Sequence, residues 1–561
     1  MAFGTATPWD NYIVYHRAWS YCPNCVVAVI GYVPLEEYMF FVIMTVTTVT
    51  FTNLIMRWHL PSTFIVPDAP VFKSMCIRYL PIVAFLGIGA KAWLVTAPET
   101  HRFYAACILW YACPVLGLLW FGSGEYICRR WPGVLTSILV PTAFLCWVDQ
   151  IAIGAGTWHI SLRTSTGLMV ARHLPLEEFM FFFLINTVLV FATCAIDRAN
   201  AILQLYQIRK LASKHQAQST IGYFIDLTWA FLQSDQALDP EPLRDLDATW
   251  DILKKSSRSF YTASAIFPFN IRQDLGVLYG FCRATDDLID NENVPLEKRK
   301  EQLNLVRHFV HELFSQKTNR FTIQWKCYKE LPSSCLVALR CFTRLRPTLE
   351  VDAIQELLDG YAWDLDRRPV VTEQDLIRYS ACVASSVGEM CSRIILLNND
   401  KSDLSCFRWT IARARDMGLV LQFINIARDI VTDSQQLGRC YIPRKWLTED
   451  EYHLLLTGAA RKISDARLRQ LSLTLVHAAN DVYRRAGRGI LRLPTESQAG
   501  IRTACAVYSA IGDVLQRSKG YPTRAYINTW ERMWIVLKSV YSSEHSHPTP
   551  RKGKMRSFVV E

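Results

Sequence analysis

The sequence predicts an all-α protein in two parts: an N-terminal multi-span transmembrane helical domain with an internal repeat, followed by a helical C-terminal domain. Three observations lead to this prediction. Five apolar runs lie in the first 235 residues, one acidic segment occurs twice among them, and two aspartate pairs with helical spacing occur in the second half. The mean hydropathy of +0.11 averages the apolar first part with a more polar second part.

The apolar runs fall near residues 38–56, 79–97, 104–122, 134–152 and 176–196. Each is close to the ~20 residues that cross the hydrocarbon core of a bilayer. A single run could be a helix buried in a soluble core, but five in succession favour membrane spans. We therefore expect about five transmembrane helices.

Basic residues are distributed unequally between the two sides of this five-span arrangement. One side carries Arg57, Lys73, Arg78, Arg129, Arg130, Arg198, Arg209, Lys210 and Lys214, and the other carries Arg17, Arg102, Arg163 and Arg172. Because the more basic side of a membrane protein faces the cytosol, the C-terminal domain is expected there. The net charge of +11 does not indicate a nucleic-acid partner, since the basic residues are scattered.

The seventeen cysteines form no repeating framework. Cys22 and Cys25 have no second pair at metal-site spacing, so we expect no zinc site. All seventeen are expected to be reduced and mostly buried.

The membrane part contains a repeat. Pro34-Leu-Glu-Glu-Tyr-Met-Phe-Phe41 recurs as Pro175-Leu-Glu-Glu-Phe-Met-Phe-Phe182. An aspartate also lies nine residues before a tryptophan ahead of each copy, as Asp10 with Trp19 and Asp149 with Trp158. Such a repeat predicts two multi-span units packed pseudo-symmetrically around a shared site.

The candidate catalytic residues of this part are its duplicated acids. They are Glu36, Glu37, Glu177 and Glu178, with Asp10 and Asp149 as candidate partners. Carboxylates at the mouth of an apolar span are costly to bury and usually functional. Proline followed by acids also begins a helix, but capping alone does not explain why the Met-Phe-Phe tail is duplicated. In an apolar cavity a carboxyl group can act as a proton donor.

These motifs resemble the integral-membrane lycopene cyclases. The resemblance implies protonation of a lycopene end group, ring closure through a carbocation, and proton loss to give a β-ring, so that γ- or β-carotene forms. The residues leave open which glutamate of each pair acts and whether one or both ends are cyclised. No Gly-x-Gly-x-x-Gly loop occurs, so neither a flavin nor a nicotinamide cofactor is expected.

The domain boundaries follow from composition. A polar, proline-containing stretch at residues 234–242 separates an expected cyclase domain at 1–235 from a second domain at 240–540, and the tail at 541–561 is expected to be disordered. The second repeat has a full span ahead of Asp149, whereas only nine residues precede Asp10. The first repeat is therefore expected to lack its opening helix.

The second half contains the pairs Asp286/Asp290 and Asp429/Asp433. On a helix, residues four apart share one face, where like charges repel unless water or a cation surrounds them. A single pair of this kind is usually surface charge. Two pairs of hard oxygen ligands suit Mg²⁺, which keeps several waters and also binds substrate phosphates.

The neighbours of these pairs strengthen the metal hypothesis. Gln422 and Asn425 extend the polar stripe of the second pair between apolar sides, as in a lined cavity. Arg258 lies among serine hydroxyls in Ser256-Ser-Arg-Ser-Phe260, which suits a phosphate cradle. A helix N-terminus would give the same pattern.

Five motifs together resemble the squalene/phytoene synthase family over about residues 245–535. They are Arg258-Ser-Phe-Tyr261, Tyr279-Gly-Phe-Cys-Arg-Ala-Thr-Asp-Asp-Leu-Ile-Asp290, Asp359-Gly-Tyr-Ala-Trp-Asp364, Tyr379 with Val383-Ala-Ser-Ser-Val-Gly388, and Gln422-Phe-Ile-Asn-Ile-Ala-Arg-Asp-Ile-Val-Thr-Asp433 with Gly438-Arg-Cys-Tyr-Ile-Pro443. The resemblance implies the all-α terpenoid synthase fold (isoprenoid synthase type I).

The same resemblance implies head-to-head condensation of two geranylgeranyl diphosphates to phytoene through prephytoene diphosphate. Mg²⁺, with Mn²⁺ as an alternative, would bind Asp286, Asp290, Asp429 and Asp433. The expected substrate and diphosphate contacts are Ser256, Arg258, Tyr261, Arg283, Gln422, Asn425, Arg428 and Arg524.

The order of the two resemblances is that of fungal fusions of a lycopene cyclase with a phytoene synthase. The expected partners are prenyl diphosphates, lycopene and membrane lipid, with other carotenoid enzymes as further candidates and no nucleic acid. The alternative is a phytoene or squalene-type synthase with a catalytically inert membrane anchor or scaffold. The duplicated Pro-Leu-Glu-Glu segment argues against a mere anchor.

Overall fold

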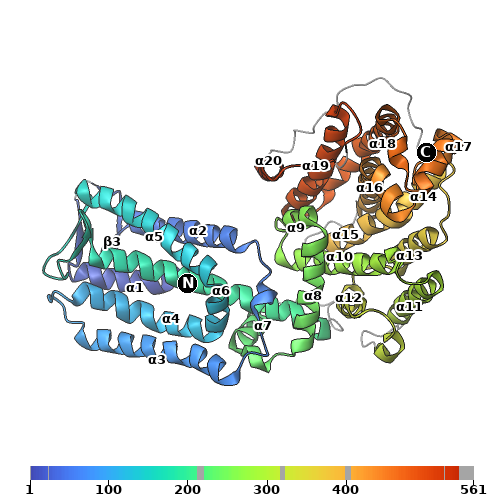
Figure 1. The fold of residues 1–561 in the computed structure, drawn as a ribbon. Coiled ribbons are helices and arrows are strands. Elements are labelled where there is room, and N and C mark those ends of the chain that lie inside the picture. The colour runs from blue at the N-terminus through green and yellow to red at the C-terminus, as the bar shows by residue number, and fades with distance from the viewer. Residues whose placement is uncertain are drawn as a thin grey trace. The chain divides into compact units, whose positions relative to one another are not determined.

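A computed structural model describes residues 2–22, 25–210, 220–315, 322–398, 406–522 and 525–541. The chain divides into two compact units, Met1–Leu243 and Arg244–Glu561 (Figure 1). The boundary expected near residues 235–240 stays a prediction. Of the tail expected at 541–561, residues 542–561 lie outside the described residues.

The first unit is built almost entirely of helices. They are α1 (Ala2–Tyr15), α2 (Leu35–Met56), α3 (Val71–Val95), α4 (Phe103–Arg129), α5 (Trp131–Gly154), α6 (Leu176–Lys210) and α7 (Thr220–Leu232), with single turns at η1 (Pro61–Phe64) and η3 (Asp235–Ala237). Helices α2 to α6 are long and apolar enough to cross a membrane, and they coincide with the five predicted runs. Helix α3 begins eight residues before its predicted run. The sequence pattern missed its first two turns because Lys73 and Arg78 lower the hydropathy there.

Short strands connect the helices at one end of this unit. They are β1 (Trp19–Tyr21), β2 (Val29–Ile30), β3 (Val33–Pro34), β4 (Trp158–Ile160), β5 (Met169–Ala171) and β6 (Leu174–Pro175). Each repeat runs helix, strand, hairpin, helix: α1, β1, β2/β3, α2 and then α5, β4, β5/β6, α6. Strand β1 pairs antiparallel with β4, with Ser20 opposite His159, and this pairing joins the two repeats.

The opening helices of the repeats differ in length. Helix α1 has 14 residues, whereas α5 has 24. The expectation that the first repeat lacks its opening helix stays a prediction. In the described residues, α1 stands before β1 as α5 stands before β4.

Helix α3 has one side packed against its neighbour and one exposed apolar side. Helix α3 packs along α4, and a Cβ added at Gly89 would lie 3.2 Å from the Pro114 ring, so the two helices approach closely there. The opposite side of α3 exposes Leu80, Val83 and Leu94. Outward apolar side chains on a span are expected where lipid rather than water surrounds it.

A buried ion-pair cluster holds the segment that leads out of the membrane helices. Asp235 is almost inaccessible and pairs with Arg198 of α6 (2.6 Å) and with Arg129 of α4. Arg198 also donates to the Gln233 carbonyl (2.8 Å), and Arg78 donates to the Leu232 carbonyl (3.1 Å). Burial raises the pKa of Asp235, but the two arginines outweigh burial and hold its pKa below the ordinary value.

We expect Asp235→Asn to lower the melting temperature of the full-length protein in detergent micelles, because it leaves two guanidinium groups without their buried carboxylate. Breaking a buried ion pair on one side costs about 3 kcal/mol or more. Glu99→Gln, a change at an exposed loop residue of the same unit, is the matched control. Equal melting temperatures for the two variants would show that the cluster does not stabilise the fold.

The second unit is all-helical among the described residues. Its helices are α8 (Pro240–Ser256), which starts in the first unit, α9 (Arg258–Ser264), α10 (Phe269–Asp290), α11 (Leu296–Ser315), α12 (Ser333–Phe342), α13 (Val351–Leu365), α14 (Glu373–Ser380), α15 (Ser386–Leu397), α16 (Phe407–Leu437), α17 (Glu449–Leu456), α18 (Asp465–Ala486), α19 (Thr495–Arg517) and α20 (Thr529–Tyr541). Short turns lie at η4 (Trp325–Tyr328), η5 (Thr343–Leu345), η8 (Arg444–Trp446), η9 (Ala460–Lys462) and η10 (Gly487–Arg492), and a π-helical turn, η6, spans Ala381–Ser385.

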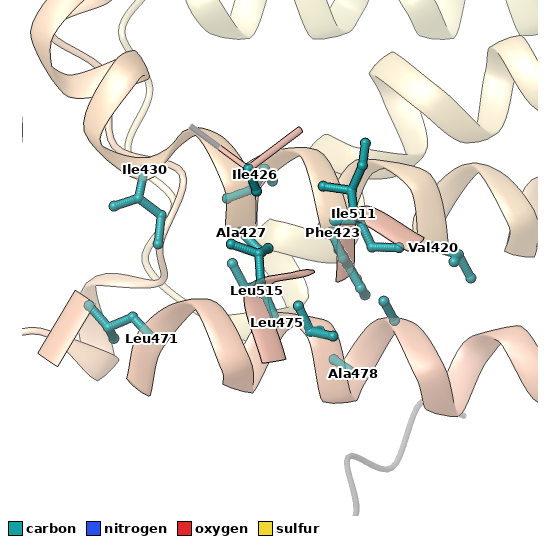
Figure 2. Packing of buried hydrophobic residues seen from close by; sticks show 14 of the residues in the cluster. Val420, Phe423, Ile426, Ala427, Ile430, Leu471, Leu475, Ala478, Ile511 and Leu515 are labelled. Carbon is teal, nitrogen blue, oxygen red and sulfur yellow. The ribbon is translucent and has the colours of Figure 1, made fainter. Parts of the chain in front are cut away.

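The core of this unit is centred on α16. Figure 2 shows Val420, Phe423, Ala427 and Ile430 of α16 facing residues of α18 and α19, among them Leu475, with all of these side chains buried. The apolar residues recur at three- and four-residue intervals, so one side of α16 faces this core. The polar residues between them, including both aspartates of the second pair, are consequently directed to other sides of the helix.

The π-helical turn lies against α16 with almost no side chain between the backbones. A Cβ added at Gly418 would lie 2.4 Å from the Ala384 carbonyl oxygen, and one added at Gly388 would lie 2.6 Å from that of Ala414. The surrounding segment Glu373–Leu397 is also long and apolar enough to cross a membrane, but it packs against α13 and α16 in the second unit. Its hydropathy reflects burial in the protein core.

Cys22 and Cys25 form a disulfide in the loop after β1. The expectation that all cysteines are reduced is therefore wrong for this pair. Two cysteines three residues apart on an irregular segment can approach closely enough to bond, which composition alone does not reveal.

Candidate active sites

The first site is a cluster of acids contributed by both repeats. Asp10 of α1 and Asp149 of α5 are buried, as is Glu178 at the start of α6. Electrostatic interactions connect Asp10 with Glu37, Glu37 with Asp149, and Asp149 with Glu178. The structure thus brings the second glutamate of each duplicated segment together with both predicted partner aspartates.

The first glutamate of each pair has a different environment. Glu36 accepts a hydrogen bond from the Val27 backbone N–H (2.8 Å). Glu177 accepts from both the backbone N–H and the hydroxyl of Thr166 (2.7 Å each). These bonds tie each hairpin loop to the start of the following helix. The structure therefore distinguishes a loop-fixing glutamate from a cluster glutamate in both repeats.

Two tyrosines complete the acid cluster and were missed by the sequence analysis. The Tyr104 hydroxyl donates to Glu178 (2.9 Å), and the Tyr21 hydroxyl is a hydrogen-bond neighbour of Glu37. Tyr21 could have been noticed because it lies in the strand that also carries Trp19. Tyr104 lies outside the repeat, at the start of α4, so no sequence pattern indicated it.

The duplicated Met-Phe-Phe tails meet next to the acids. The rings of Phe40 and Phe182, one from each repeat, are 6.0 Å apart in an edge-to-face arrangement. The ring of Phe181 stacks on that of Trp9, the residue before Asp10, with 6.1 Å between the ring centroids. Aromatic faces attract cations, so this apolar wall suits a site in which positive charge develops. It also explains why the tail is duplicated with the acids.

The second site contains the two aspartate pairs of the second unit. Asp286 and Asp290 lie in the last turns of α10, and Asp429 and Asp433 lie in α16; all four are half-buried. Burial and the neighbouring Asp290 raise the pKa of Asp286 to about 7. Burial and the neighbouring Asp429 raise the pKa of Asp433 to about 8. Each pair thus shows the mutual repulsion that its spacing predicts.

An arginine accompanies each pair. Arg283 forms ion pairs with Asp286 (3.4 Å) and with the adjacent, exposed Asp287 (2.6 Å). Arg428 binds Asp429 through two nitrogens, Nε and Nη2. Fixed guanidinium groups next to a diphosphate site add charge that does not depend on a metal ion.

Asp364 and Arg439 connect the two pairs and were not predicted as site residues. Arg439 pairs with Asp290 (2.7 Å) and lies 3.9 Å from Asp364. Asp364 in turn accepts hydrogen bonds from the hydroxyls of Tyr379 and Tyr441, both 3.0 Å, whose rings stack at 4.8 Å. Burial raises the pKa of Asp364 to about 6, although Arg439 opposes this rise.

The signal for this network was present in the sequence. Asp364, Tyr379, Arg439 and Tyr441 all belong to the motifs that carry the resemblance. They are polar residues within apolar surroundings, at four separate places in the chain. Their convergence depends on how α13, α14 and the segment after α16 pack, which spacing within one helix does not determine.

The remaining predicted contacts have varied surroundings. The Oδ1 atom of Asn425 is buried without a hydrogen-bond partner among the described residues, and Gln422 is half-buried on the same helix. Ser256 is exposed at the end of α8. The ring of Tyr261 packs against Trp250, and the guanidinium group of the buried Arg272 lies over it. A role for Tyr261 in diphosphate binding stays a prediction.

Two predicted basic contacts are not described in full. Arg258 begins α9, where Ser257 caps the helix by accepting from the Phe260 N–H (3.3 Å), but the Arg258 side chain lies outside the described part of the structure. Arg524 lies outside the described residues. The serine cradle therefore contains a helix cap, the alternative that the sequence left open.

The donor set fits hard divalent cations. In the described part of the chain, no three His, Cys, Asp or Glu side chains form a ready-made metal site. Each aspartate pair offers carboxylate oxygens, and Mg²⁺ commonly takes one or two carboxylates together with waters and substrate phosphates. The raised pKa values of Asp286 and Asp433 and the unpaired Asn425 oxygen are consistent with such a site.

Comparison with known proteins agrees with this arrangement. Residues 253–531 match the family model described as squalene/phytoene synthase. A bifunctional lycopene cyclase/phytoene synthase of Phycomyces blakesleeanus is 58% identical over 100% of this chain and 93% of that protein. Those of Blakeslea trispora and Sporisorium reilianum are 57% and 31% identical, covering 100% and 96% of this chain and 93% and 92% of theirs. The chain therefore belongs to the family of bifunctional lycopene cyclase/phytoene synthases.

Proposed function

We propose that the second unit condenses two geranylgeranyl diphosphates head to head into prephytoene diphosphate and then phytoene, with release of two diphosphates. The observation that carries this proposal is the convergence of the aspartate pairs of α10 and α16 on the Asp364–Arg439 network. Two acidic pairs and three arginines in one unit suit a substrate whose charged group leaves as diphosphate.

Each group has a distinct task in this reaction. Arg283, Arg428 and Arg439 hold positive charge next to the departing diphosphate. Asp286, Asp290, Asp429 and Asp433 would hold Mg²⁺ or Mn²⁺, which when bound neutralises diphosphate charge. Ser256, Arg258, Gln422, Asn425 and Arg524 would add polar contacts, as the family resemblance implies. The apolar side chains beside α16 exclude water, which would otherwise quench an allylic carbocation.

The network around Asp364 would orient Arg439. Asp364 receives two tyrosine hydrogen bonds and faces Arg439, which in turn holds Asp290. This chain of contacts fixes the direction of a guanidinium between the two aspartate helices. Arg439 is therefore a candidate diphosphate contact, and Asp364, Tyr379 and Tyr441 are its positioning residues.

We further propose that the first unit cyclises lycopene by acid catalysis. A carboxyl group of the cluster gives its proton to the end-group double bond, the resulting cation is attacked by the neighbouring double bond to close the ring, and a carboxylate accepts the proton that is then lost. Atoms and electrons balance without an oxidant or reductant. Glu37 and Glu178 are the proposed acids, with Asp10 and Asp149 as proton-sharing partners.

The placement of the chain in the membrane follows from its charges. We place the second unit on the cytosolic side, where most basic loop residues lie. The substrates would be prenyl diphosphates for the second unit and lycopene, dissolved in the lipid, for the first. Other carotenoid enzymes are candidate partners, because other enzymes must convert phytoene, the product of the second unit, into lycopene, the substrate of the first.

Asp286→Asn and Asp429→Asn are each expected to lower phytoene formation by about 100-fold or more, because each removes a charge that a cation or diphosphate site requires. Product is measured from membranes given geranylgeranyl diphosphate and Mg²⁺. Asp287→Asn, next to Asp286 but exposed, is the matched control and should retain most activity. Equal losses in all three variants would count against the metal role of the pairs.

A chelator such as EDTA should stop phytoene formation and leave ring formation from added lycopene unchanged. Only phytoene formation, the reaction of the second unit, uses a divalent cation in the proposed mechanism. The incubation contains no NADPH, so that phytoene formation also distinguishes this synthase from a reductive squalene-type enzyme. Loss of both activities, or phytoene formation that persists at full rate in the chelator, would contradict the assignment.

Glu37→Gln and Glu178→Gln should lower ring formation by about 100-fold, the range of general acid catalysis. Glu36→Gln and Glu177→Gln should retain it, because a glutamine Oε1 still accepts the backbone hydrogen bonds of Val27 and Thr166. Phytoene formation by the same membranes shows that each variant folds. Equal loss within each glutamate pair would overturn the distinction between them.

A further inference from the structure

Helix α20 (Thr529–Tyr541) turns its most apolar side outward. Trp530 is 80% exposed and Trp534 is 68% exposed. Met533, Leu537 and Val540 are also exposed. These five residues follow the three- and four-residue spacing of one helix face. We call them the outer stripe.

The other side of α20 is fixed in the second unit. Helix α20 packs along α19, Ile535 lies against the core of the unit, and Ser539 is buried. The outward direction of the outer stripe therefore follows from the fold. Soluble surfaces rarely expose several large apolar side chains side by side, and such patches usually mark an interaction surface.

Positive charge flanks the outer stripe along the chain. Between residues 517 and 541 the sequence contains five basic residues and one acidic one. The basic residues are Arg517, Lys519, Arg524, Arg532 and Lys538, and the acidic residue is Glu531. Lys538 and Lys519 are exposed in the structure, as is the aromatic ring of Tyr526.

We propose that the outer stripe binds the surface of an anionic lipid bilayer, as a monotopic anchor of the second unit. Tryptophan side chains favour the membrane–water interface, and an amphipathic helix with basic flanks lies in that plane. A second copy of this chain could offer its own outer stripe, but the basic flanks of the two copies would then repel each other. Lipid satisfies both the apolar stripe and the charge.

The first unit strengthens this choice of partner. Its spans already hold the chain at a bilayer, and the segment after them is clamped through Asp235 only nine residues before Arg244 begins the second unit. Connector helix α7 likewise exposes Ile221, Phe224 and Ile225. A tethered anchor meets lipid at high effective concentration, so even a short stripe is enough for binding.

The test uses the full-length protein in vesicles of phosphatidylcholine and phosphatidylglycerol. The photoreactive residue benzoylphenylalanine replaces Trp534. In the matched control it replaces Trp409, a tryptophan of the same unit that is 43% exposed and lies outside the outer stripe. After irradiation, mass spectrometry identifies the adducts. We expect lipid adducts at position 534 to be several-fold more abundant than at position 409. Retained phytoene formation shows that each sample is folded.

Three results would overturn the proposal. These are equal lipid labelling at both positions, adducts at position 534 that join two copies of the chain, and adducts that join position 534 to the first unit of the same chain. Neutral phosphatidylcholine vesicles form a second arm, in which lipid labelling at position 534 should fall because the basic flanks then lack anionic headgroups. With the probe at Leu537, the Trp530→Glu/Trp534→Glu variant should show several-fold less lipid labelling than the protein that keeps both tryptophans.

Discussion

Repulsion between carboxylates placed side by side is the constraint on which both halves of this molecule depend. Water normally relieves such repulsion, but the acids of the first site are largely buried and the four aspartates of the second are half-buried. In the first unit, tyrosine hydroxyls provide hydrogen bonds to the acids, and the cluster has no arginine among its described contacts. In the second unit, Arg283, Arg428 and Arg439 provide it. The two sites therefore differ in the kind of group that compensates their acids: hydroxyls in the first unit and guanidinium groups in the second.

The two folds place these acids in different ways. A helix satisfies its own backbone groups, which suits a segment long and apolar enough to span a bilayer, and the acids of the first unit lie near the ends of such helices. The first unit uses the ends of α1, α2, α5 and α6. The second unit uses long helices: α16 buries an apolar side against α18 and α19 (Figure 2). The helical spacing directs its aspartates to another side.

Much of this was predictable from the sequence because it depends on local periodicity. Hydropathy over 20 residues predicts α2 to α6, and four-residue spacing places Asp286 with Asp290 on one face. Other features depend on tertiary contacts. Which glutamate joins the cluster is decided by the loop N–H groups of Val27 and Thr166, and the position of Arg439 is decided by Asp364, 75 residues earlier in the chain. Sequence spacing contains no information about either contact.

The pairing of β1 with β4 has an evolutionary consequence. Among the described strands, β1 pairs only with β4 and β4 only with β1. A repeat by itself would therefore present a bare strand edge to its surroundings. An ancestral single-repeat protein with this architecture would be driven to homodimerise through that edge. Duplication within one gene would then convert a concentration-dependent assembly into a permanent one, and it would free the two copies to diverge in sequence.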